Sequence, residues 1–431
     1  MIPALRHWLH RRRHPARYAQ LDWLLKNQAR NREQVLQQQQ RDLAGLLAHA
    51  RAQTPYYAEM LAPFPAGTPL EALPILSKDA VASSLDDLLD RAADRKQVKL
   101  GHTGGSTGKP LAFWYDEYKH ELMRAGMMRG FMMSGWRPGQ KVMYFWGARH
   151  DTARGGVFGG GWDDFISAEE TIAAVEYSEA KLNAWARRVQ DWRPTLLYGY
   201  ASALSELARY VVAAGMAMPD SLIGVYSTAE MLDDQQRETM QQAFACKVFN
   251  QYGCREVPNI AWECRHGQMH VFADLVQLES VEMEGEDRLL VTSLSNRLMP
   301  FIRYDLGDSG RLLEGECACG SPFPLMEMGM CRHNDLIRTR DGKQFHPAYF
   351  NRLLYGMSRI RQYQWVQTDL DRIVLNLVSA APLSDATLAG LRATLWRDVA
   401  TGMRLDVNYL AEIPRSAAGK HRFVIGLRVR S

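Results

Sequence analysis

Between residues 140 and 252, short apolar runs alternate with longer amphipathic stretches. The short runs have the length of strands: KVMYFWG (141–147), PTLLYGY (194–200), LIGVYST (222–228) and CKVFNQYG (246–253). The stretches between them carry apolar residues at helical spacing, as at Leu182, Trp185, Val189 and Trp192, and at Leu204, Leu207, Ala208 and Val211. Repeated strand, helix and strand predict an α/β fold with a mostly parallel sheet that helices cover on both faces.

The pattern differs on either side of this segment. Residues 34–53 are helical in pattern and Gln-rich, whereas beyond residue 260 the apolar period changes to 2, as in RLLVTS (288–293) and RIVLNLV (372–378). The last hundred residues predict strands and one helix with Leu388, Leu391, Leu395 and Val399 on one face. We therefore expect a body over residues 1–331, β-rich at about 260–330, and a small α+β domain over residues 332–431.

The composition of the chain restricts the classes of protein to which it can belong. The chain has 431 residues, of which 46% are hydrophobic, enough for two or three domains with cores of their own. Six cysteines in so long a chain do not form a disulfide framework, so they are interpreted as intracellular thiols or metal ligands. The N-terminus has no apolar signal region and no run is long enough to span a bilayer, so we expect a cytoplasmic protein without a transmembrane segment.

The N-terminus concentrates positive charge. Five arginines lie within the first 17 residues: Arg6, Arg11, Arg12, Arg13 and Arg17. Such a segment contacts an acidic lipid surface, contacts a nucleic acid or forms a solvated helix face. A net charge of only +4 favours the solvated face, so we expect no nucleic-acid partner; a homodimer is left open.

Small, aromatic and charged residues follow each predicted parallel strand. The segments are WGARHD (146–151), YGYASA (198–203), STAEM (227–231) and YGCRE (252–256). Ligands of open parallel sheets bind beyond the carboxyl ends of the strands, so together these segments predict one pocket. Taken singly, each is more typical of a plain turn.

The segment HTGGSTGKPLAFWYD (102–116) predicts a phosphate-binding loop. Its glycines allow tight backbone turns, and Ser106, Thr107 and Lys109 supply donors for phosphate oxygens. The spacing is not that of a Walker A loop, because Pro110 follows the lysine where a magnesium-binding Ser or Thr is required. The alternative is a flexible surface loop.

From about residue 40 the sequence resembles the adenylate-forming superfamily, in the phenylacetate-CoA ligase branch with its capsule-biosynthesis relatives. Six segments match the motifs of that family in the correct order: TGGSTGKP, STAEM, NQYGCRE, PFIRYDLGDSG (300–310), CRHNDLI (331–337) and SAAGKHR (416–422). The resemblance implies an enzyme that joins a carboxylic acid to the α-phosphate of ATP and releases pyrophosphate.

The resemblance also implies a role for individual residues. Ser106, Thr107 and Lys109 hold the β- and γ-phosphates, Glu256 binds Mg²⁺, and Lys420 on a mobile C-terminal lid acts in catalysis during adenylation. The implied nucleotide-binding residues are Ala229, Glu230, Tyr252, Gly253, Asp308 and Arg332. Each has a plainer interpretation as well: Asp308 caps a turn, Tyr252 packs in the core, Glu256 pairs with an arginine, and Lys420 lies in a solvated tail.

The second half-reaction is implied less directly. In the family a hinge residue lets the lid rotate, and here Asn334 stands where an acidic residue is frequent, leaving Asp335 for that role. The expected acceptor is a thiol, coenzyme A; the alternatives are an amine or hydroxyl acceptor, or a non-catalytic nucleotide-binding protein. The acid is unidentified, with His150, Tyr198 and Tyr200 as the candidate residues of its pocket.

Four Cys and His residues have the composition of a zinc site. Cys264 and His270 lie six positions apart, and Cys317 and Cys319 follow some fifty residues later. Three thiolates and one imidazole suit tetrahedral zinc in a structural role, although His266 competes with His270 for the position. Similar Cys/His positions occur in the family that the chain resembles. The other three cysteines are interpreted as ordinary packing residues or residues near the site: Cys246, Cys254 and Cys331.

Overall fold

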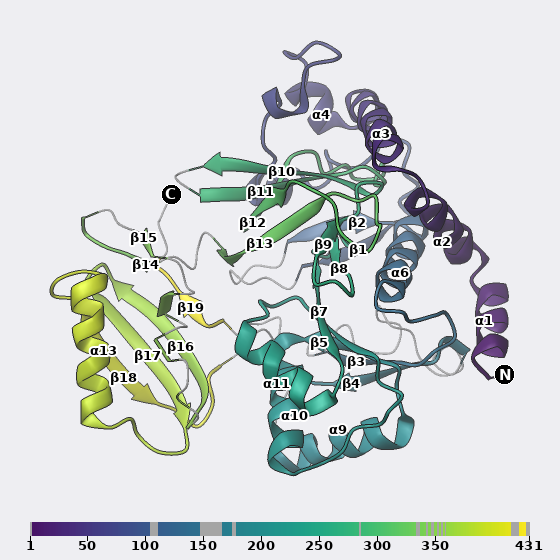
Figure 1. Cartoon of the computed structure of the whole chain (residues 1–431). Coiled ribbons are helices and arrows are strands. Elements are labelled where there is room, and N and C mark those ends of the chain that lie inside the picture. The colour runs from purple at the N-terminus through teal and green to yellow at the C-terminus, as the bar shows by residue number, and fades with distance from the viewer. Residues whose placement is uncertain are drawn as a thin grey trace.

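The described residues of the computed structural model form four sheets, and the two largest lie in a large body and in a smaller C-terminal domain (Figure 1). The residues that the structure describes are 2–103, 111–146, 166–174, 178–283, 286–332, 337–341, 344–345, 349–350, 353–354, 357, 359–414 and 422–427. The predicted α/β class with a separate α+β C-terminal domain is confirmed.

Within the described residues, the larger sheet has eleven strands in the order β10-β11-β12-β13-β9-β8-β7-β6-β5-β3-β4. Five of them pair in parallel, as the strand-helix-strand pattern predicts: β3 (Val142–Trp146), β4 (Glu169–Ala173), β5 (Leu196–Tyr200), β6 (Gly224–Thr228) and β7 (Lys247–Tyr252). Strands β3, β5 and β6 are almost completely buried and largely apolar, because both of their faces are covered.

The β-rich region after residue 260 continues the same sheet. Its strands pair antiparallel with one another, and β8 pairs antiparallel with β7. They are β8 (Ala261–Glu263), β9 (Met269–Val271), β10 (Val276–Met283), β11 (Glu286–Ser293), β12 (Tyr304–Leu313) and β13 (Leu325–Arg332). The switch from parallel to antiparallel pairing therefore occurs at β7.

Helices cover both faces of the parallel part. Three helices pack their buried side chains on one face: α9 (Glu179–Trp192), α10 (Ala201–Ala213) and α11 (Asp234–Phe244). Helix α6 (Glu117–Met132) packs on the other face, where a Cβ built on Gly130 would lie 2.2 Å from the Trp262 ring. This close approach requires glycine at position 130.

The N-terminal part of the body is helical and runs along its outer side (Figure 1). It comprises α1 (Ile2–Arg13), α2 (Pro15–Gln28), α3 (Arg32–Gln53), α4 (Pro55–Met60), a 3₁₀ turn (Leu70–Ala72) and α5 (Lys78–Ser83). The predicted Gln-rich helix is α3, which Asn31 and Gln34 begin with a reciprocal capping box. None of the described helices is long and apolar enough to cross a bilayer.

The C-terminal domain has its own core. Its four-stranded sheet has the order β18-β17-β16-β19, with strands β16 (Ile360–Asp369), β17 (Arg372–Ser379), β18 (Arg404–Tyr409) and β19 (Val424–Ile425). Helix α13 (Asp385–Asp398) packs on it through Leu391 and Leu395, and β14 (Ile337–Arg338) pairs with β15 (Gln344–Phe345). Strand β13 ends at Arg332, where we predict the domain boundary, and that boundary stays a prediction.

A buried ion pair joins the helical N-terminus to the sheet. The Arg129 guanidinium of α6 donates to both oxygens of Asp274, at 2.7 and 2.9 Å, and these side chains are 0% and 3% exposed. Asn27 of α2 donates to Asp274 as well, at 3.2 Å, and the guanidinium lies 3.9 Å from the Phe272 ring centroid. Three parts of the body, α2, α6 and the connection between β9 and β10, thus meet at one charge pair.

Replacing Asp274 by alanine leaves the Arg129 guanidinium buried without its counter-charge. We expect the free energy of unfolding to fall by about 3–5 kcal/mol, measured by urea denaturation. Glu327→Ala is the matched control, because it breaks the Arg311–Glu327 pair, whose side chains are 63% and 56% exposed. The control is expected to change stability by less than about 1 kcal/mol, and equal effects of the two substitutions would contradict the prediction.

Candidate functional site

Four strand ends meet at one edge of the sheet. Strands β3, β5, β6 and β7 are neighbours in this order and run parallel, so their carboxyl ends lie side by side. The segments predicted to form one pocket begin at these ends. The edge is therefore the place where ligands of such sheets bind.

A polar layer fixes the ends of β5, β6 and β7 relative to one another. The side-chain oxygen of Gln251 accepts hydrogen bonds from the Tyr198 hydroxyl, at 3.3 Å, and from the Thr228 hydroxyl. Burial raises the pKa of Tyr198 to about 12, so its hydroxyl remains a donor at neutral pH. The layer holds the loops that follow these strands in register.

Tyr252 and Asp308 come together although 56 residues separate them. The Tyr252 hydroxyl, at the end of β7, donates to a carboxylate oxygen of Asp308 on β12 at 3.1 Å. Asp308 pairs in register with Arg332 on β13. Gly253 follows in a turn so tight that a Cβ there would lie 2.9 Å from the backbone nitrogen of Asn259. Three predicted nucleotide-binding positions, 252, 253 and 308, thus lie in one region, with the backbone of Arg332 beside them.

Glu256 is buried, and one of its two carboxylate oxygens lacks a hydrogen-bond partner among the described residues. The Tyr304 hydroxyl donates to its Oε1 atom at 2.8 Å, whereas Oε2 has no hydrogen-bond partner among the described residues. Glu256 is only 4% exposed, and a buried carboxylate oxygen without a partner is costly. The arrangement is typical of a position that a cation or a ligand completes.

Lys119 places a positive charge beside Glu256. Its Nζ atom donates to the Glu256 carbonyl oxygen at 2.7 Å and lies 4.8 Å from the centroid of the Phe113 ring. Burial lowers the pKa of Lys119 to about 8, even though Glu256, Cys254 and Asp116 act in the opposite direction. The ammonium group is therefore close to titration at neutral pH.

The base of the predicted phosphate loop lies beside this segment. Strands β1 (Lys99–His102) and β2 (Ala112–Tyr115) pair antiparallel, and Thr103 and Leu111 exchange two hydrogen bonds at their ends. Arg255 donates to the His102 carbonyl oxygen at 3.0 Å. The contact ties the hairpin that carries the loop to the segment that contains Glu256.

Ala229 and Glu230 follow β6 at the same edge. Ala229 has a left-handed backbone with φ of 65°, and the Glu230 carboxylate accepts a hydrogen bond from the Ser202 amide at 2.8 Å. Glu230 thus caps the N-terminus of α10, which has no cap from its own preceding side chain. Its predicted place at the edge of adenine stays a prediction.

The tyrosines predicted for the acid pocket are buried beside one tryptophan. Tyr198 is 5% and Tyr200 2% exposed, and their ring centroids lie 6.0 and 4.7 Å from that of Trp146 at the end of β3. The aromatic cluster supports the edge of the sheet. Contact of these rings with an acid stays a prediction.

Several predicted residues lie outside the described residues. These are Ser106, Thr107 and Lys109 of the phosphate loop, His150 of the acid pocket, Asn334 and Asp335 of the hinge, and Lys420. Their roles therefore rest on the sequence.

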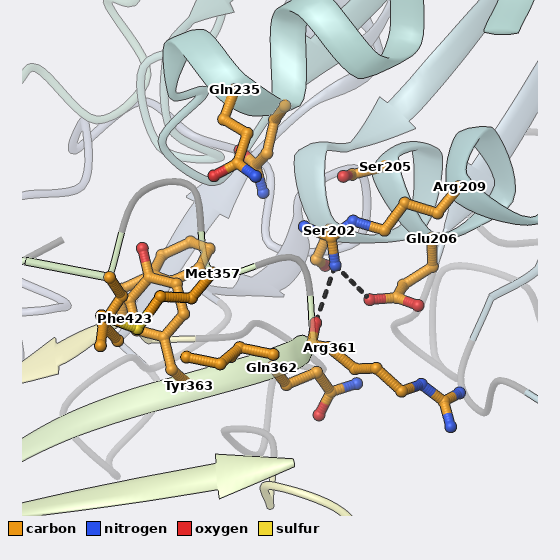
Figure 2. Close-up of a pocket in the computed structure, with 13 residues that line it drawn as sticks. Ser202, Ser205, Glu206, Arg209, Gln235, Met357, Arg361, Gln362, Tyr363 and Phe423 are labelled. Carbon is orange, nitrogen blue, oxygen red and sulfur yellow. Dashed lines mark hydrogen bonds and ion pairs between the residues drawn. The ribbon is translucent and has the colours of Figure 1, made fainter. Parts of the chain in front are cut away.

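A groove lined by both polar and apolar side chains lies where the C-terminal domain meets the body (Figure 2). Ser202, Ser205, Glu206 and Arg209 of α10 line one side, and residues 360–363 of β16 line the other. Arg209 donates to Glu206 at 3.2 Å and to the Arg361 carbonyl oxygen at 2.7 Å, so one side chain spans the groove. The groove starts close to the end of β5, at Ser202, two residues after Tyr200.

The four predicted metal ligands come together in the antiparallel part of the sheet, after β8, in β9 and between β12 and β13. The ligand atoms of Cys264, His270, Cys317 and Cys319 all lie within 4.8 Å of one another. The Sγ atoms of Cys264 and Cys317 are 3.7 Å apart, and Cys319 Sγ lies 3.3 Å from His270 Nε2. Sulfur atoms about 2.3 Å from a tetrahedral zinc ion are about 3.8 Å apart, so the spacing fits such an ion.

Two turns of the same form present the cysteines. In residues 264–267 and 317–320 the amide of a glycine donates to the carbonyl oxygen of the first cysteine, at 2.9 and 3.0 Å. Gly267 and Gly320 have φ of 76° and 75°, and in each turn a backbone amide lies 3.4 Å from a cysteine Sγ, that of Cys264 or Cys317. Amides directed at sulfur favour thiolates, which are the form that binds metal.

His270 is held in place by the Phe323 carbonyl oxygen, which lies 3.4 Å from its Nδ1 atom and leaves Nε2 for the cluster. The competing His266 contributes its backbone amide to Cys264, and its side chain is not in the cluster.

Sequence reasoning missed three contributions to these sites. Tyr304 lies inside the matched segment PFIRYDLGDSG, so a tyrosine four residues before Asp308 was a usable signal. The repeated Cys-x-x-Gly spacing at 264–267 and 317–320 was another. Lys119 carries no signal, because only the fold brings α6 next to Glu256.

Comparison with known proteins matches the C-terminal part to a family model described as the CapK C-terminal domain, over residues 337–426. The chain is 24% identical to Protein CapK of Staphylococcus aureus over 364 residues, 83% of this chain and 80% of that protein. It is 26% identical to the phenylacetate-coenzyme A ligase of Thermus thermophilus, with coverage of 92% and 97%.

The fold is similar to that of 2-hydroxyisobutyryl-CoA ligase in complex with 2-HIB-AMP, with a TM-score of 0.70 at 18% identity. The match covers 90% of this chain and 88% of that structure. The CapK C-terminal domain model, the relatives named CapK and phenylacetate-coenzyme A ligase, and the similar fold of an acyl-CoA ligase together support an adenylate-forming, phenylacetate-CoA ligase-like family that includes CapK.

Proposed function

We propose that this protein activates a carboxylic acid with ATP as an acyl-adenylate and releases pyrophosphate. The observation that carries the proposal is the pair of hydrogen bonds at one edge of the sheet, the buried bond Tyr304–Glu256 and the partly buried bond Tyr252–Asp308. Asp308 would accept hydrogen bonds from the ribose hydroxyls, and Tyr252 would stack on adenine. Ser106, Thr107 and Lys109 would hold the phosphates, with Arg332, Ala229 and Glu230 around the nucleotide.

The unpartnered Oε2 atom of Glu256 suits Mg²⁺. A hard cation prefers carboxylate oxygens, and Oε2 has no hydrogen-bond partner among the described residues. Bound there, Mg²⁺ would neutralise charge on the phosphate oxygens of ATP. Tyr304 would hold the carboxylate in its orientation by its bond to Oε1.

We further propose that the acyl group passes to a thiol, that of coenzyme A. Relatives named phenylacetate-coenzyme A ligase support this acceptor. The C-terminal lid would rotate about Asp335 from one position to another. The Arg209 side chain crosses the groove and donates to the Arg361 carbonyl oxygen, and such a rotation can break this polar contact. The sequence likeness to CapK keeps an amine or hydroxyl acceptor as the second candidate.

Exchange of labelled pyrophosphate into ATP across a panel of aryl, fatty and amino acids tests the first half-reaction. We expect at least one acid to give exchange and a hydroxamate on trapping with hydroxylamine. Lys420→Ala is expected to lower that exchange by about 100-fold while ATP still binds, since one charge-stabilising group is lost. Lys26→Ala, an exposed lysine of α2, is the control.

Two results would contradict this proposal. One is an absence of exchange with every acid of the panel. The other is an equal loss of exchange and of ATP binding in Lys420→Ala, which would make Lys420 a structural residue. Adding coenzyme A, then amines and sugars, to the trapped adenylate identifies the acceptor separately.

Lys119 gives the proposed reaction a pH dependence. Because its pKa is lowered to about 8, the ammonium charge beside Glu256 is present below that pH and is lost as pH rises through it. We expect exchange by the wild type to decline between pH 7 and pH 9. Lys119→Met should be several-fold less active at pH 7 and should lack this decline, whereas Lys119→Arg should keep its activity at pH 9. A wild-type pH profile in Lys119→Met would refute the role.

We also propose that Cys264, His270, Cys317 and Cys319 bind one structural zinc ion. With four protein ligands the ion would have no open position, so it would hold the two turns together and take no part in the reaction. The ends of β8 and β12 would thereby be clamped to each other.

Elemental analysis after purification without chelators is expected to find about one zinc per chain. Cys319→Ala should bind less than about half an equivalent and unfold at a lower temperature. Cys246→Ala is the matched control, since Cys246 is a free thiol outside the cluster. Wild type with less than half an equivalent of any metal would rule out the site.

A further inference from the structure

The inner side of helix α1 is anchored to the body. His10 is buried and its Nδ1 atom lies 2.9 Å from the Tyr18 hydroxyl, and the His7 ring stacks on the same tyrosine. A Cβ built on Gly139 would lie 2.1 Å from the Pro3 carbonyl oxygen, so the helix lies directly on that turn. These contacts determine which side of α1 faces outward.

The outward side is apolar. Ile2, Leu5 and Trp8 recur every three residues along one side of the helix, and they are 65%, 58% and 49% exposed. Trp23 of the adjoining α2 is 40% exposed. Large apolar residues exposed singly are ordinary, but a row of them on one helix marks an interaction surface.

Positive charge is concentrated in the same N-terminal segment as this row of apolar residues. The first 21 residues contain five arginines and no acidic residue, whereas the other 410 residues contain 47 basic and 48 acidic residues. The excess positive charge of the chain therefore lies entirely in this segment. A solvated helix face, which the sequence favours, explains the arginines but leaves the apolar row unexplained.

The arginines are divided between two roles. Arg17 is buried and pairs with Glu121 at 2.8 Å, so it serves the fold. Arg11, Arg12 and Arg13 are exposed in the last turn of α1, although Arg11 also pairs with Asp22. The Arg12 guanidinium lies 3.9 Å from the centroid of the Trp8 ring, which places a cation directly beside the apolar row.

We propose that the outward face of α1, formed by Ile2, Leu5, Trp8 and Arg11–Arg13, docks the protein on an anionic membrane surface. A helix with aliphatic and tryptophan side chains on its outer side and arginines beside them binds at the lipid headgroups. The face is at the opposite side of the molecule from the C-terminal domain, so docking leaves the groove free (Figure 1).

Two other occupants fit the face less well. A nucleic acid would contact the arginines, but its phosphates offer nothing to Ile2 and Leu5. A second copy related by two-fold symmetry would bury the arginines of both copies in one interface, to which α1 contributes no acidic residue that could pair with them. Lipid headgroups above acyl chains satisfy the charged and the apolar part together.

Co-sedimentation of the full chain with vesicles tests the proposal. We expect binding to vesicles of phosphatidylcholine with 30% phosphatidylglycerol, and much weaker binding to phosphatidylcholine alone. Arg11→Gln/Arg12→Gln/Arg13→Gln should lower the partition coefficient by about 100-fold. Ile2→Ser/Leu5→Ser/Trp8→Ser should lower it by at least about tenfold. Trp396→Ser is the matched control, because Trp396 is 53% exposed on α13 and belongs to no described site.

Circular dichroism and thermal unfolding of each variant show that the fold is kept, which is expected since every replaced side chain is exposed. The proposal is overturned if the wild type fails to bind anionic vesicles or if the serine variant binds them as the wild type does. It is also overturned if duplex DNA binds more tightly than the vesicles. A change from dimer to monomer in the serine variant, by analytical ultracentrifugation, would assign the face to a second copy instead.

Discussion

The body is organised around the buried pair between Arg129 and Asp274. Both charges are removed from water, so each is stable only while the other is in place, and α6 is thereby fixed to the connection between β9 and β10. Asn27 and the Leu24 carbonyl oxygen bring α2 to the same point. The guanidinium also lies over Phe272 and Phe323, and Phe323 in turn orients His270. One charge pair thus connects the N-terminal helices, the antiparallel strands and the Cys/His cluster.

The candidate active site lies where the sheet changes direction. Strand β7 runs parallel to β6 and antiparallel to β8, and Glu256 lies in the connection between β7 and β8. The antiparallel half then returns β12 to this place, which brings Tyr304 to Glu256 and Asp308 to Tyr252. Each carboxylate thus accepts a hydrogen bond from a tyrosine hydroxyl of the other half of the sheet, and neither of these bonds is a surface ion pair that salt would screen.

The Cys/His cluster and helix α1 are two further features of the body. The Cys/His cluster brings a turn after β8 together with a turn before β13, although 53 residues separate Cys264 from Cys317. Helix α1 lies at the far side of the body and presents apolar and cationic side chains to its surroundings. The Cys/His cluster, the candidate active site and the proposed docking face therefore lie in different regions of one chain.

The sequence by itself determined the alternation of strands and helices, because apolar period depends on local geometry alone. It also determined the order of the family motifs and which four Cys and His residues come together in the structure. It could not place Lys119 beside Glu256, bring Tyr304 to the same carboxylate or show that Arg17 is buried while Arg12 is exposed. Those facts depend on which elements pack together, and packing joins residues more than a hundred positions apart, such as Arg17 and Glu121. The tertiary structure alone decided these pairings, because burial sets whether a charge needs a partner.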